Sequence, residues 1–235
     1  MTTQMAIGAL CTSLTTLLFP EQCALCGLEA CGPLCAVCQE DLRRIEPACE
    51  TCAAPLPVAV RRCGQCQRRP PPWASASIPY VWEGAARRAV LNLKQSGSTT
   101  LIDALLDAAA PELPGTTGAL CPMPTTFYRR WQRGFNPAES IAWALARRLG
   151  LSVNSDLLRR TAGPRQTGSN KAQRRANVRA VFYARGSAPA TVTLVDDVVT
   201  TGASAEAATQ ALRRAGAGEV HLFALARATA SVGRR

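Results

Sequence analysis

The spacing of apolar residues changes along the chain, and beyond about residue 76 it follows a regular alternation. Short apolar runs, several of them rich in valine, alternate with longer segments whose apolar residues recur every three to four positions. The short runs predict strands at 77–84, 118–124, 191–195 and 219–227. The longer segments predict helices at 85–94, 101–110, 137–150 and 204–217. Such alternation indicates an α/β fold, with a parallel sheet and helices on both faces.

End signals support these elements. Asn136 stands where it can cap the helix 137–150, and Gly150 stands where it can end that helix. Pro111 is expected to stop the helix 101–110. The run 191–195 has β-branched residues on both faces, which is typical of a buried parallel strand.

The segment before residue 70 is organised differently, because eight of the chain's 11 cysteines lie there in four Cys-x-x-Cys pairs. Each such turn directs two thiolates at one centre, and two turns complete a tetrahedral zinc shell. The pairs are Cys23/Cys26, Cys35/Cys38, Cys49/Cys52 and Cys63/Cys66. Consecutive pairing predicts two zinc ribbons, each holding one Zn²⁺, although a cross-braced pairing has the same spacing. Four thiolates leave no open coordination position, so we expect structural zinc.

Other uses of the cysteines fit less well. Four pairs outside a βαβ setting do not resemble a thioredoxin-type redox couple, and disulfides need an oxidising compartment. Cys11, Cys31 and Cys121 are left over and are expected to be small buried side chains. Of these, Cys31 is the one that could replace a zinc ligand.

The proline-rich stretch 67–75 predicts a domain boundary. We expect residues 1–70 to form an N-terminal helix plus the double zinc ribbon, and residues 71–235 to form the α/β domain. No stretch approaches the roughly 20 apolar residues that cross a bilayer. No basic residue precedes the apolar opening, so a signal peptide is not expected. The sequence predicts a cytoplasmic protein without a membrane span.

The net charge of +11 is unevenly distributed. Residues 157–195 contain eight basic residues and no acid. Such a block attracts phosphate, carried either by a nucleic acid or by a small metabolite. A solvated arginine-rich surface is the alternative interpretation.

Against this basic background, Asp196 and Asp197 stand together at the carboxyl end of a predicted strand, where ligands bind in parallel sheets. The small and hydroxyl-bearing residues that follow lead into a helix and form a candidate phosphate cradle: Thr200, Thr201, Gly202, Ala203 and Ser204. No lysine follows the glycine, so this is not a Walker A loop. Carboxylates next to a phosphate cradle suit a sugar phosphate.

The run V-T-L-V-D-D-V-V-T-T-G-A-S resembles the 13-residue signature of type I phosphoribosyltransferases. In that family the acids contact the ribose hydroxyls of phosphoribosyl pyrophosphate (PRPP), and the loop binds its 5′-phosphate. The resemblance implies a type I phosphoribosyltransferase-like sheet, with Asp196 and Asp197 as catalytic residues on the ribose. It also implies Mg²⁺, bound together with PRPP. Thr193 is a minor departure, at a position that is usually apolar.

The wider sequence is similar to the ComF family of competence-associated proteins. The resemblance covers roughly residues 15–228 and includes the cysteine pairs, the proline-rich stretch, "LNLKQSG", "CPMP", "RRWQRGFN" and "RQTGSNKAQRRANVRAVF". It implies that Met123, Pro124 and Thr125 form a pyrophosphate loop. It further implies substrate-binding roles for Lys94, Arg133 and Arg175. Lys94 matches the family together with Gly97, and Arg133 matches it together with Gly134, Phe135 and Asn136. Gln166, Arg175, Asn177 and Arg179 match a segment that resembles the mobile loop of amidophosphoribosyltransferases.

Three functions follow from the resemblance. The chain is a phosphoribosyltransferase with an unknown acceptor, a non-catalytic DNA-uptake factor that binds single-stranded DNA or competence-machinery proteins, or a regulator that senses PRPP. The four tryptophans are scattered, which weakens the case for base stacking. No general base is evident, since the only histidine, His221, lies within a predicted strand. Whether the chain is an enzyme is left open by its residues.

Overall fold

A computed structural model describes residues 21–58, 60–109, 118–161 and 181–228. The expected N-terminal helix lies outside these ranges, as does the segment that holds Gln166, Arg175, Asn177 and Arg179. No helix in the described part of the chain combines the length and the apolar composition that a bilayer-spanning helix needs.

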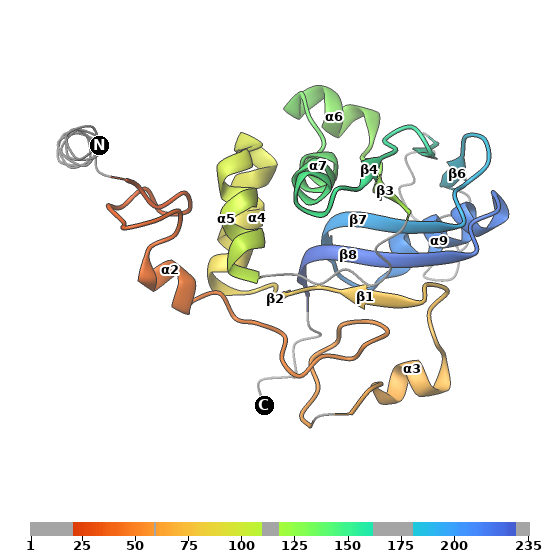
Figure 1. The fold of residues 1–235 in the computed structure, drawn as a ribbon, viewed down its shortest axis with the longest axis horizontal. Helices are drawn as coiled ribbons and strands as arrows, with labels where there is room; N and C mark the ends of the chain where they lie inside the picture. The colour runs from red at the N-terminus through yellow and green to blue at the C-terminus, as the bar shows by residue number, and fades with distance from the viewer. Residues whose placement is uncertain (1–20, 59, 110–117, 162–180, 229–235) are drawn as a thin grey trace, which may run out of the picture.

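The centre of the molecule is a six-stranded sheet in which every strand pair is parallel. This confirms the predicted parallel sheet (Figure 1). The strands, in their order across the sheet, are β1 (Ser75–Ser77), β8 (Glu219–Arg227), β7 (Thr191–Val199), β3 (Ala119–Pro122) and β4 (Ser152–Val153), with β2 (Tyr80–Val81) also paired to β8.

Helices cover both faces of the sheet, as predicted. Three helices pack on one face: α4 (Gly84–Ser96), α5 (Thr99–Ala109) and α7 (Pro137–Leu149). The other face is covered by α9 (Ala203–Arg214), whose alanines meet Val192 and Leu194 of β7. The neighbouring Val195 faces the α4–α5 side instead, because successive strand residues point to opposite faces.

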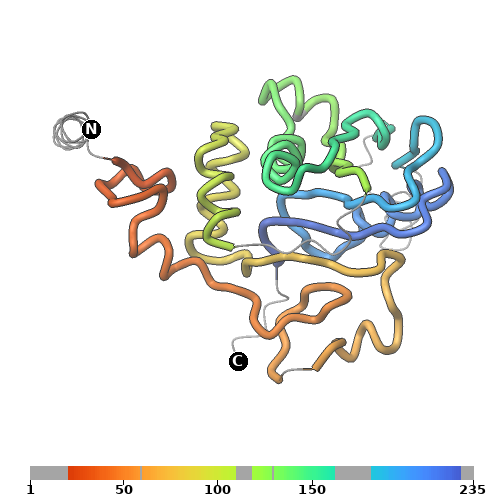
Figure 2. The backbone as a smooth tube through the Cα atoms, in the orientation of Figure 1, coloured from red at the N-terminus to blue at the C-terminus, as the bar shows by residue number. Residues whose placement is uncertain are grey.

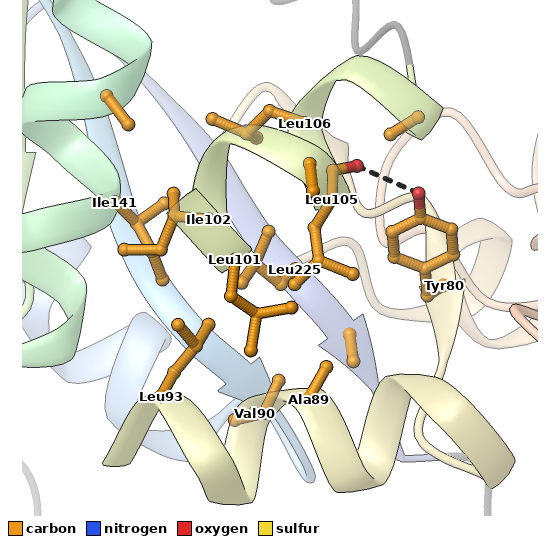
Figure 3. Close-up of a cluster of buried hydrophobic side chains, with 14 of the residues drawn as sticks. Tyr80, Ala89, Val90, Leu93, Leu101, Ile102, Leu105, Leu106, Ile141 and Leu225 are labelled. Atoms are coloured by element: carbon orange, nitrogen blue, oxygen red, sulfur yellow. Dashed lines mark hydrogen bonds between the residues drawn. The ribbon is translucent and has the colours of Figure 1, made fainter. Parts of the chain in front are cut away.

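The core on the α4–α5 side is built from aliphatic side chains (Figure 3). Leu93 and Val90 of α4 meet Leu101 and Ile102 of α5, all at most 1% exposed. Tyr80 closes this core, and its buried hydroxyl donates to the carbonyl oxygen of Leu105 at 2.9 Å. Because Leu93 is fixed here, the next residue of α4 is held at the edge of the core.

Several element ends differ from the prediction. The expected strand 77–84 is broken into β1 and β2, because Pro79 has no N–H to donate to the ladder. The strand predicted at 191–195 runs on to Val199, since β8 continues to pair with it as far as Arg227. The helix expected from 204 begins at Ala203.

Other elements were not predicted. They are the short helices α2 (Ala36–Glu40), α3 (Gly64–Arg68) and α6 (Phe127–Arg133), and the antiparallel pair β5 (Leu158–Arg160) and β6 (Phe182–Ala184). Each spans at most seven residues, too few for a clear period of apolar positions.

The cysteine-bearing segment lies along the side of the sheet domain (Figure 2). Cys23 and Cys38 are buried in the same apolar cluster as α4 and α5. Further along, the N–H of Ala76 in β1 donates to the carbonyl oxygen of Glu50 at 3.2 Å, so this segment covers the edge of the sheet. The boundary at residue 70 stays a prediction, and apolar contacts cross it.

Candidate functional site

The candidate residues lie at the point where the order of the strands reverses. From β3 the chain first adds β4 on one side, and it later adds β7 on the other side. In open parallel sheets ligands bind in the crevice at the carboxyl ends of two such strands. Here those ends carry Met123, directly after β3, and Asp196 with Asp197 in β7. Two separately predicted groups therefore share one edge of the sheet.

Asp196 and Asp197, the acid pair, lie within β7 rather than beyond its end, which corrects the sequence-based placement. The last residue of β3, Pro122, is in register with Val195. Beyond that point β7 is paired only with β8, where Asp196 is in register with Ala224. The acid pair thus extends past β3, and no strand of the described ranges pairs with that side of β7 at this level.

The two acids differ in their electrostatic surroundings. The Asp197 carboxylate forms an ion pair with Lys94 of α4, with Oδ2 and Nζ 3.1 Å apart, and both side chains are largely buried. Lys94 also lies 5.6 Å from the centroid of the Trp82 ring. Lys94 is far from the acid pair in the sequence, and the resemblance had separately singled it out as a substrate-binding residue. The fold brings it into direct contact with Asp197.

Burial and the neighbouring Asp197 charge raise the pKa of Asp196 to about 8, while the Asp197 N–H and Lys94 act in the other direction. That N–H donates to Asp196 Oδ1 at 2.9 Å. The surroundings of Asp196 therefore favour its protonated form, beside the Asp197 carboxylate that is paired with Lys94. Such a pair can both accept and donate hydrogen bonds, as the two hydroxyls of a diol require.

Residues 200–204, the hydroxyl loop, connect β7 to the first turn of α9. Thr200, Thr201 and Ser204 are exposed, and the N–H of Ala203 donates weakly to Thr201 Oγ1 at 3.4 Å. Gly202 has φ +79°, a left-handed conformation that side-chain-bearing residues rarely adopt. N–H groups in the first turn of a helix lack intrahelical partners and favour anions. The predicted cradle chemistry is compatible with this geometry.

The loop after β3 is held in place by two hydrogen bonds, one from the backbone N–H of Met123 and one to its carbonyl oxygen. The N–H of Met123 donates to the carbonyl oxygen of Val195 at 2.7 Å, next to the acid pair. The carbonyl oxygen of Met123 accepts a hydrogen bond from the buried side chain of Asn136 at 3.0 Å. Asn136 does precede α7 as predicted, but its side chain makes no capping hydrogen bond, which corrects the expected role.

Gly97 ends α4 with φ +64°, and a Cβ atom there would lie 3.2 Å from the ring of Phe135. The segments around Lys94 and Asn136, which the resemblance singled out, are therefore packed against each other. Arg133 is partly buried at the end of α6, whereas Arg175 lies outside the described residues.

The cysteines form two separate clusters. In each, the four sulfur atoms lie within 4.8 Å of one another. The first cysteine cluster is Cys23, Cys26, Cys35 and Cys38, and the second is Cys49, Cys52, Cys63 and Cys66. This confirms consecutive pairing and rules out the cross-braced alternative, and Cys31 belongs to neither cluster.

The spacing of the sulfur atoms fits zinc. Cys26 and Cys35 have their sulfur atoms 3.7 Å apart, and Cys52 and Cys63 have theirs 3.8 Å apart. A tetrahedron with Zn–S bonds of about 2.3 Å has edges of about 3.8 Å. These sulfur atoms are too far apart for disulfides. Both clusters are therefore suited to structural Zn²⁺.

The helix α6 carries a surface that the sequence analysis missed. Its aromatic side chains are 85%, 60% and 75% exposed, at Phe127, Tyr128 and Trp131 respectively. Positions three and four residues apart share one face of a helix, so the three rings lie together. Arg130 lies in the same helix, and its side chain is about half exposed. The spacing in "FYRRWQR" could have indicated this, but the sequence analysis considered only the tryptophans.

A surface cavity of about 500 Å³ lies elsewhere, beside α4 and the first cysteine cluster. Its lining includes Arg88, Asn92 and Gln95 but no carboxylate. The candidate site is therefore defined by the groups that converge at the strand ends, and this cavity plays no part in it.

Comparisons with known proteins agree with these features. The double zinc ribbon domain family matches residues 14–67. "DNA utilization protein YhgH" of Escherichia coli O157:H7 is 30% identical over 223 residues, covering 88% of this chain and 97% of that protein. "Competence protein F" of Haemophilus influenzae is 27% identical over 208 residues, covering 83% of this chain and 90% of that protein.

Among solved structures, TT1426 from Thermus thermophilus is similar at 20% identity, covering 63% of this chain and 85% of that chain. The TM-score is 0.29, which is too low to define a shared fold.

Proposed function

Because the chain belongs to the ComF family of competence-associated proteins, we propose that it is a PRPP-binding, phosphoribosyltransferase-like protein that serves DNA uptake. One observation supports the PRPP site above all others. The acid pair and the adjoining hydroxyl loop meet the Met123 loop, which is far from them in the sequence, at the reversal of strand order. Their chemistry matches the hydroxyls, the 5′-phosphate and the pyrophosphate of PRPP in turn. The acceptor is unknown, and a cytoplasmic location remains part of the proposal.

In this proposal each group acts on one part of the ligand. Asp196 and Asp197 hold the ribose hydroxyls, and the hydroxyl loop binds the 5′-phosphate through its N–H groups and hydroxyls. Residues 123–125 contact the pyrophosphate, and the cation of Lys94, already paired with Asp197, lies beside the acid pair. Departure of pyrophosphate leaves positive charge on the sugar, which the Asp197 carboxylate stabilises.

Mg²⁺ would be bound through carboxylate oxygens of the acid pair and would offset the negative charge that develops on pyrophosphate. In the described part of the chain, the two cysteine clusters are the only groups of three or more potential metal ligands. Mg²⁺ is therefore expected to arrive with PRPP and not as a resident ion.

Among the described residues, no side chain at the site is an evident general base. His221 is 6% exposed and lies in β8 opposite Thr193, within the sheet. Its Nδ1 is 2.9 Å from Ser75 Oγ. A histidine in this position lies within the sheet and does not reach the strand ends.

Calorimetric titration with PRPP and Mg²⁺ tests the proposal. We expect the wild-type protein to bind, and Asp196→Asn and Asp197→Asn to lower the affinity severely. Asp107→Asn is the matched control, because Asp107 is exposed on α5 and pairs with Arg148. Equal affinity of the wild-type protein and both acid-pair variants would rule out the assignment.

A second assay separates a transferase from a sensor. A transferase should release pyrophosphate slowly from PRPP alone and faster with a suitable nucleobase or DNA fragment. Binding without any release, across a range of acceptors, would favour the PRPP-sensing regulator.

A second candidate function, binding of single-stranded DNA, is favoured by the exposed rings of α6. Aromatic faces stack on bases without regard to sequence, and cations nearby pair with phosphates. The net charge of +11 is compatible with this partner. The scattered tryptophans had argued against it, but Phe127 and Tyr128 join Trp131 on one face.

Fluorescence anisotropy with a labelled oligothymidine tests this candidate. We expect Phe127→Ala and Trp131→Ala each to weaken binding about 5- to 150-fold, since stacking contributes about 1–3 kcal/mol per base. Binding should also fall steeply with salt. Trp143→Ala is the control, because Trp143 is half exposed on α7. Binding that is independent of salt or of both α6 variants would exclude this surface.

A further inference from the structure

Trp73 lies between the second cysteine cluster and the hydroxyl loop. Trp73 is only 5% exposed, although it belongs to the proline-rich stretch 67–75 that was predicted to be a domain boundary. The indole N–H donates to the carbonyl oxygen of Thr51 at 2.7 Å. On its other side, the ring meets Gly202, where a Cβ atom would lie 3.2 Å from Trp73 Cη2. One buried side chain thus contacts both regions.

The Thr51 end of this contact belongs to the metal cluster. Thr51 is 5% exposed and stands between the ligands Cys49 and Cys52. The N–H of Cys63 donates to Cys49 Sγ at 3.3 Å, and the N–H of Ala53 donates to the carbonyl oxygen of Cys49 at 2.7 Å, so the turn that contains Thr51 is tied to the cluster. The carbonyl oxygen of Thr51 accepts from Trp73. Ordering of this turn by a metal therefore also fixes the acceptor of the indole.

The Gly202 end belongs to the hydroxyl loop. Gly202 is the N-cap of α9, and its carbonyl oxygen accepts from the N–H of Glu206 at 2.8 Å. The ring of Trp73 occupies the space beside the Gly202 backbone, so displacement of the ring would remove the support of this turn.

We propose that Trp73 is a positioning residue, which couples metal occupancy of the second cysteine cluster to the conformation of the hydroxyl loop. The consequence for ligand binding rests on the proposed PRPP site. With the cluster loaded, the indole holds the loop in its binding conformation, and loss of the metal loosens it. Coupling between two sites is reciprocal, so PRPP should also slow release of metal from the second cluster.

Hydrogen exchange of the zinc-loaded full chain provides the first test, because it needs no ligand. We compare the wild-type protein, the wild-type protein stripped of one zinc by a chelator, and two variants. Trp73→Phe removes the N–H donor and keeps a ring, whereas Trp73→Leu removes both contacts. Trp143→Phe, on the exposed side of α7, is the control. We expect faster exchange at residues 200–206 in Trp73→Leu and in the stripped protein, and a smaller effect in Trp73→Phe.

The second test measures zinc release to a chelator with and without PRPP and Mg²⁺. In the wild-type protein PRPP should slow release of one zinc by about 5-fold or more, which is the usual size of coupling between sites. The slowing should be absent in Trp73→Leu. If Trp73 only stabilised the fold, Trp73→Leu would change the rate of zinc release with PRPP and without it, and PRPP would still slow the release.

The outcomes separate the two proposals. Unchanged exchange at 200–206 after zinc removal overturns the coupling, even where PRPP binds normally. Coupled exchange without any PRPP binding supports the role of Trp73 and rejects the PRPP site. If Trp73→Leu does not fold, Trp73→Phe and zinc removal from the wild-type protein still decide the question.

Discussion

The two cysteine clusters are both built from two Cys-x-x-Cys pairs, with similar distances between their sulfur atoms, but they differ in their surroundings. Cys23 and Cys38 of the first cluster are buried in the large apolar cluster formed with α4 and α5. The buried cysteines of the second cluster form a small apolar cluster of their own. The second cluster instead reaches the candidate site through Trp73. The same metal chemistry therefore stabilises the scaffold at one place and borders the site at the other.

The junction between the first cluster and α4 is also tied by charge. Asp41, the C-cap of α2, forms an ion pair with Arg88 of α4. Asp41 Oδ2 and Arg88 Nη2 are 2.9 Å apart. Gly84 at the start of α4 lies so close that a Cβ atom there would be 2.9 Å from Cγ of Asp41. Loss of order at the first cluster is thus expected to spread into the core, whereas loss at the second is expected to spread into the site.

The largest expected effect is on stability at the first cluster. Cys38→Ser removes a buried ligand, and we expect it to lower the free energy of unfolding by about 4 kcal/mol or more, because metal binding is part of folding in such modules. Thermal unfolding and metal analysis would show this as a lower midpoint and the loss of one zinc. Cys31→Ser, at an exposed cysteine outside both clusters, is the control. Equal stability of the two variants would contradict the comparison.

Two glycine substitutions sharpen the same contrast. Gly84→Ala places a methyl group against Asp41 at φ +47°, and we expect it to cost about 2 kcal/mol or more. Gly202→Ala meets only the edge of the Trp73 ring, at φ +79°, and should cost about 1 kcal/mol. Denaturant unfolding gives both values, and PRPP titration should show the larger loss of affinity in Gly202→Ala. The reverse order in affinity would place the binding site elsewhere.

Asp196→Asn should stabilise the protein while it weakens ligand binding. The folded-state pKa of Asp196, about 8, lies above its ordinary value of 3.8. The folded protein therefore keeps a proton that the unfolded chain releases, and stability falls as pH rises from about 4 to about 8. Asparagine removes this loss, so we expect a gain of about 1 kcal/mol or more at pH 8, since one pKa unit corresponds to about 1.4 kcal/mol.

Unfolding curves at pH 5 and pH 8 check this expectation, because the difference between variant and wild-type protein should grow between them. A difference that is constant with pH would mean that Asp196 is ionised in the folded protein at both values.

The smallest expected effect lies in the core beside the first cluster. Tyr80→Phe keeps the ring and removes the hydroxyl that donates to Leu105, leaving that carbonyl oxygen without this donor. The expected cost is about 1 kcal/mol, and the affinity for PRPP should not change. A change in affinity would show that this core and the site are coupled more closely than the contacts indicate.

Much of the scaffold could be predicted from sequence, because its signals are local. The four cysteine pairs indicated two clusters, and Gly150 ends α7 as predicted, in a left-handed conformation. The strand 219–227 matches β8 at both ends. In each case the structure is determined by a residue type, or by a regular spacing of residues, within a short stretch of the sequence.

The parts that failed depend on distant neighbours. Asn136 has a typical capping position, yet its side chain bonds to Met123, which only the packing of β3 against α7 brings within reach. Trp73 looked like part of a linker, but it is buried between Thr51 and Gly202. β7 runs past the acid pair because β8 lies beside it. The spacing of residues along the chain does not predict contacts with residues that are distant in the sequence.

Hydrogen exchange with and without PRPP and Mg²⁺ tests the central claim most directly, because it shows where the ligand binds. The account predicts slower exchange in the Met123 loop and at residues 196–206, with little change around the first cysteine cluster. Protection confined to the cysteine clusters or to α6, with none at residues 196–206, would contradict it.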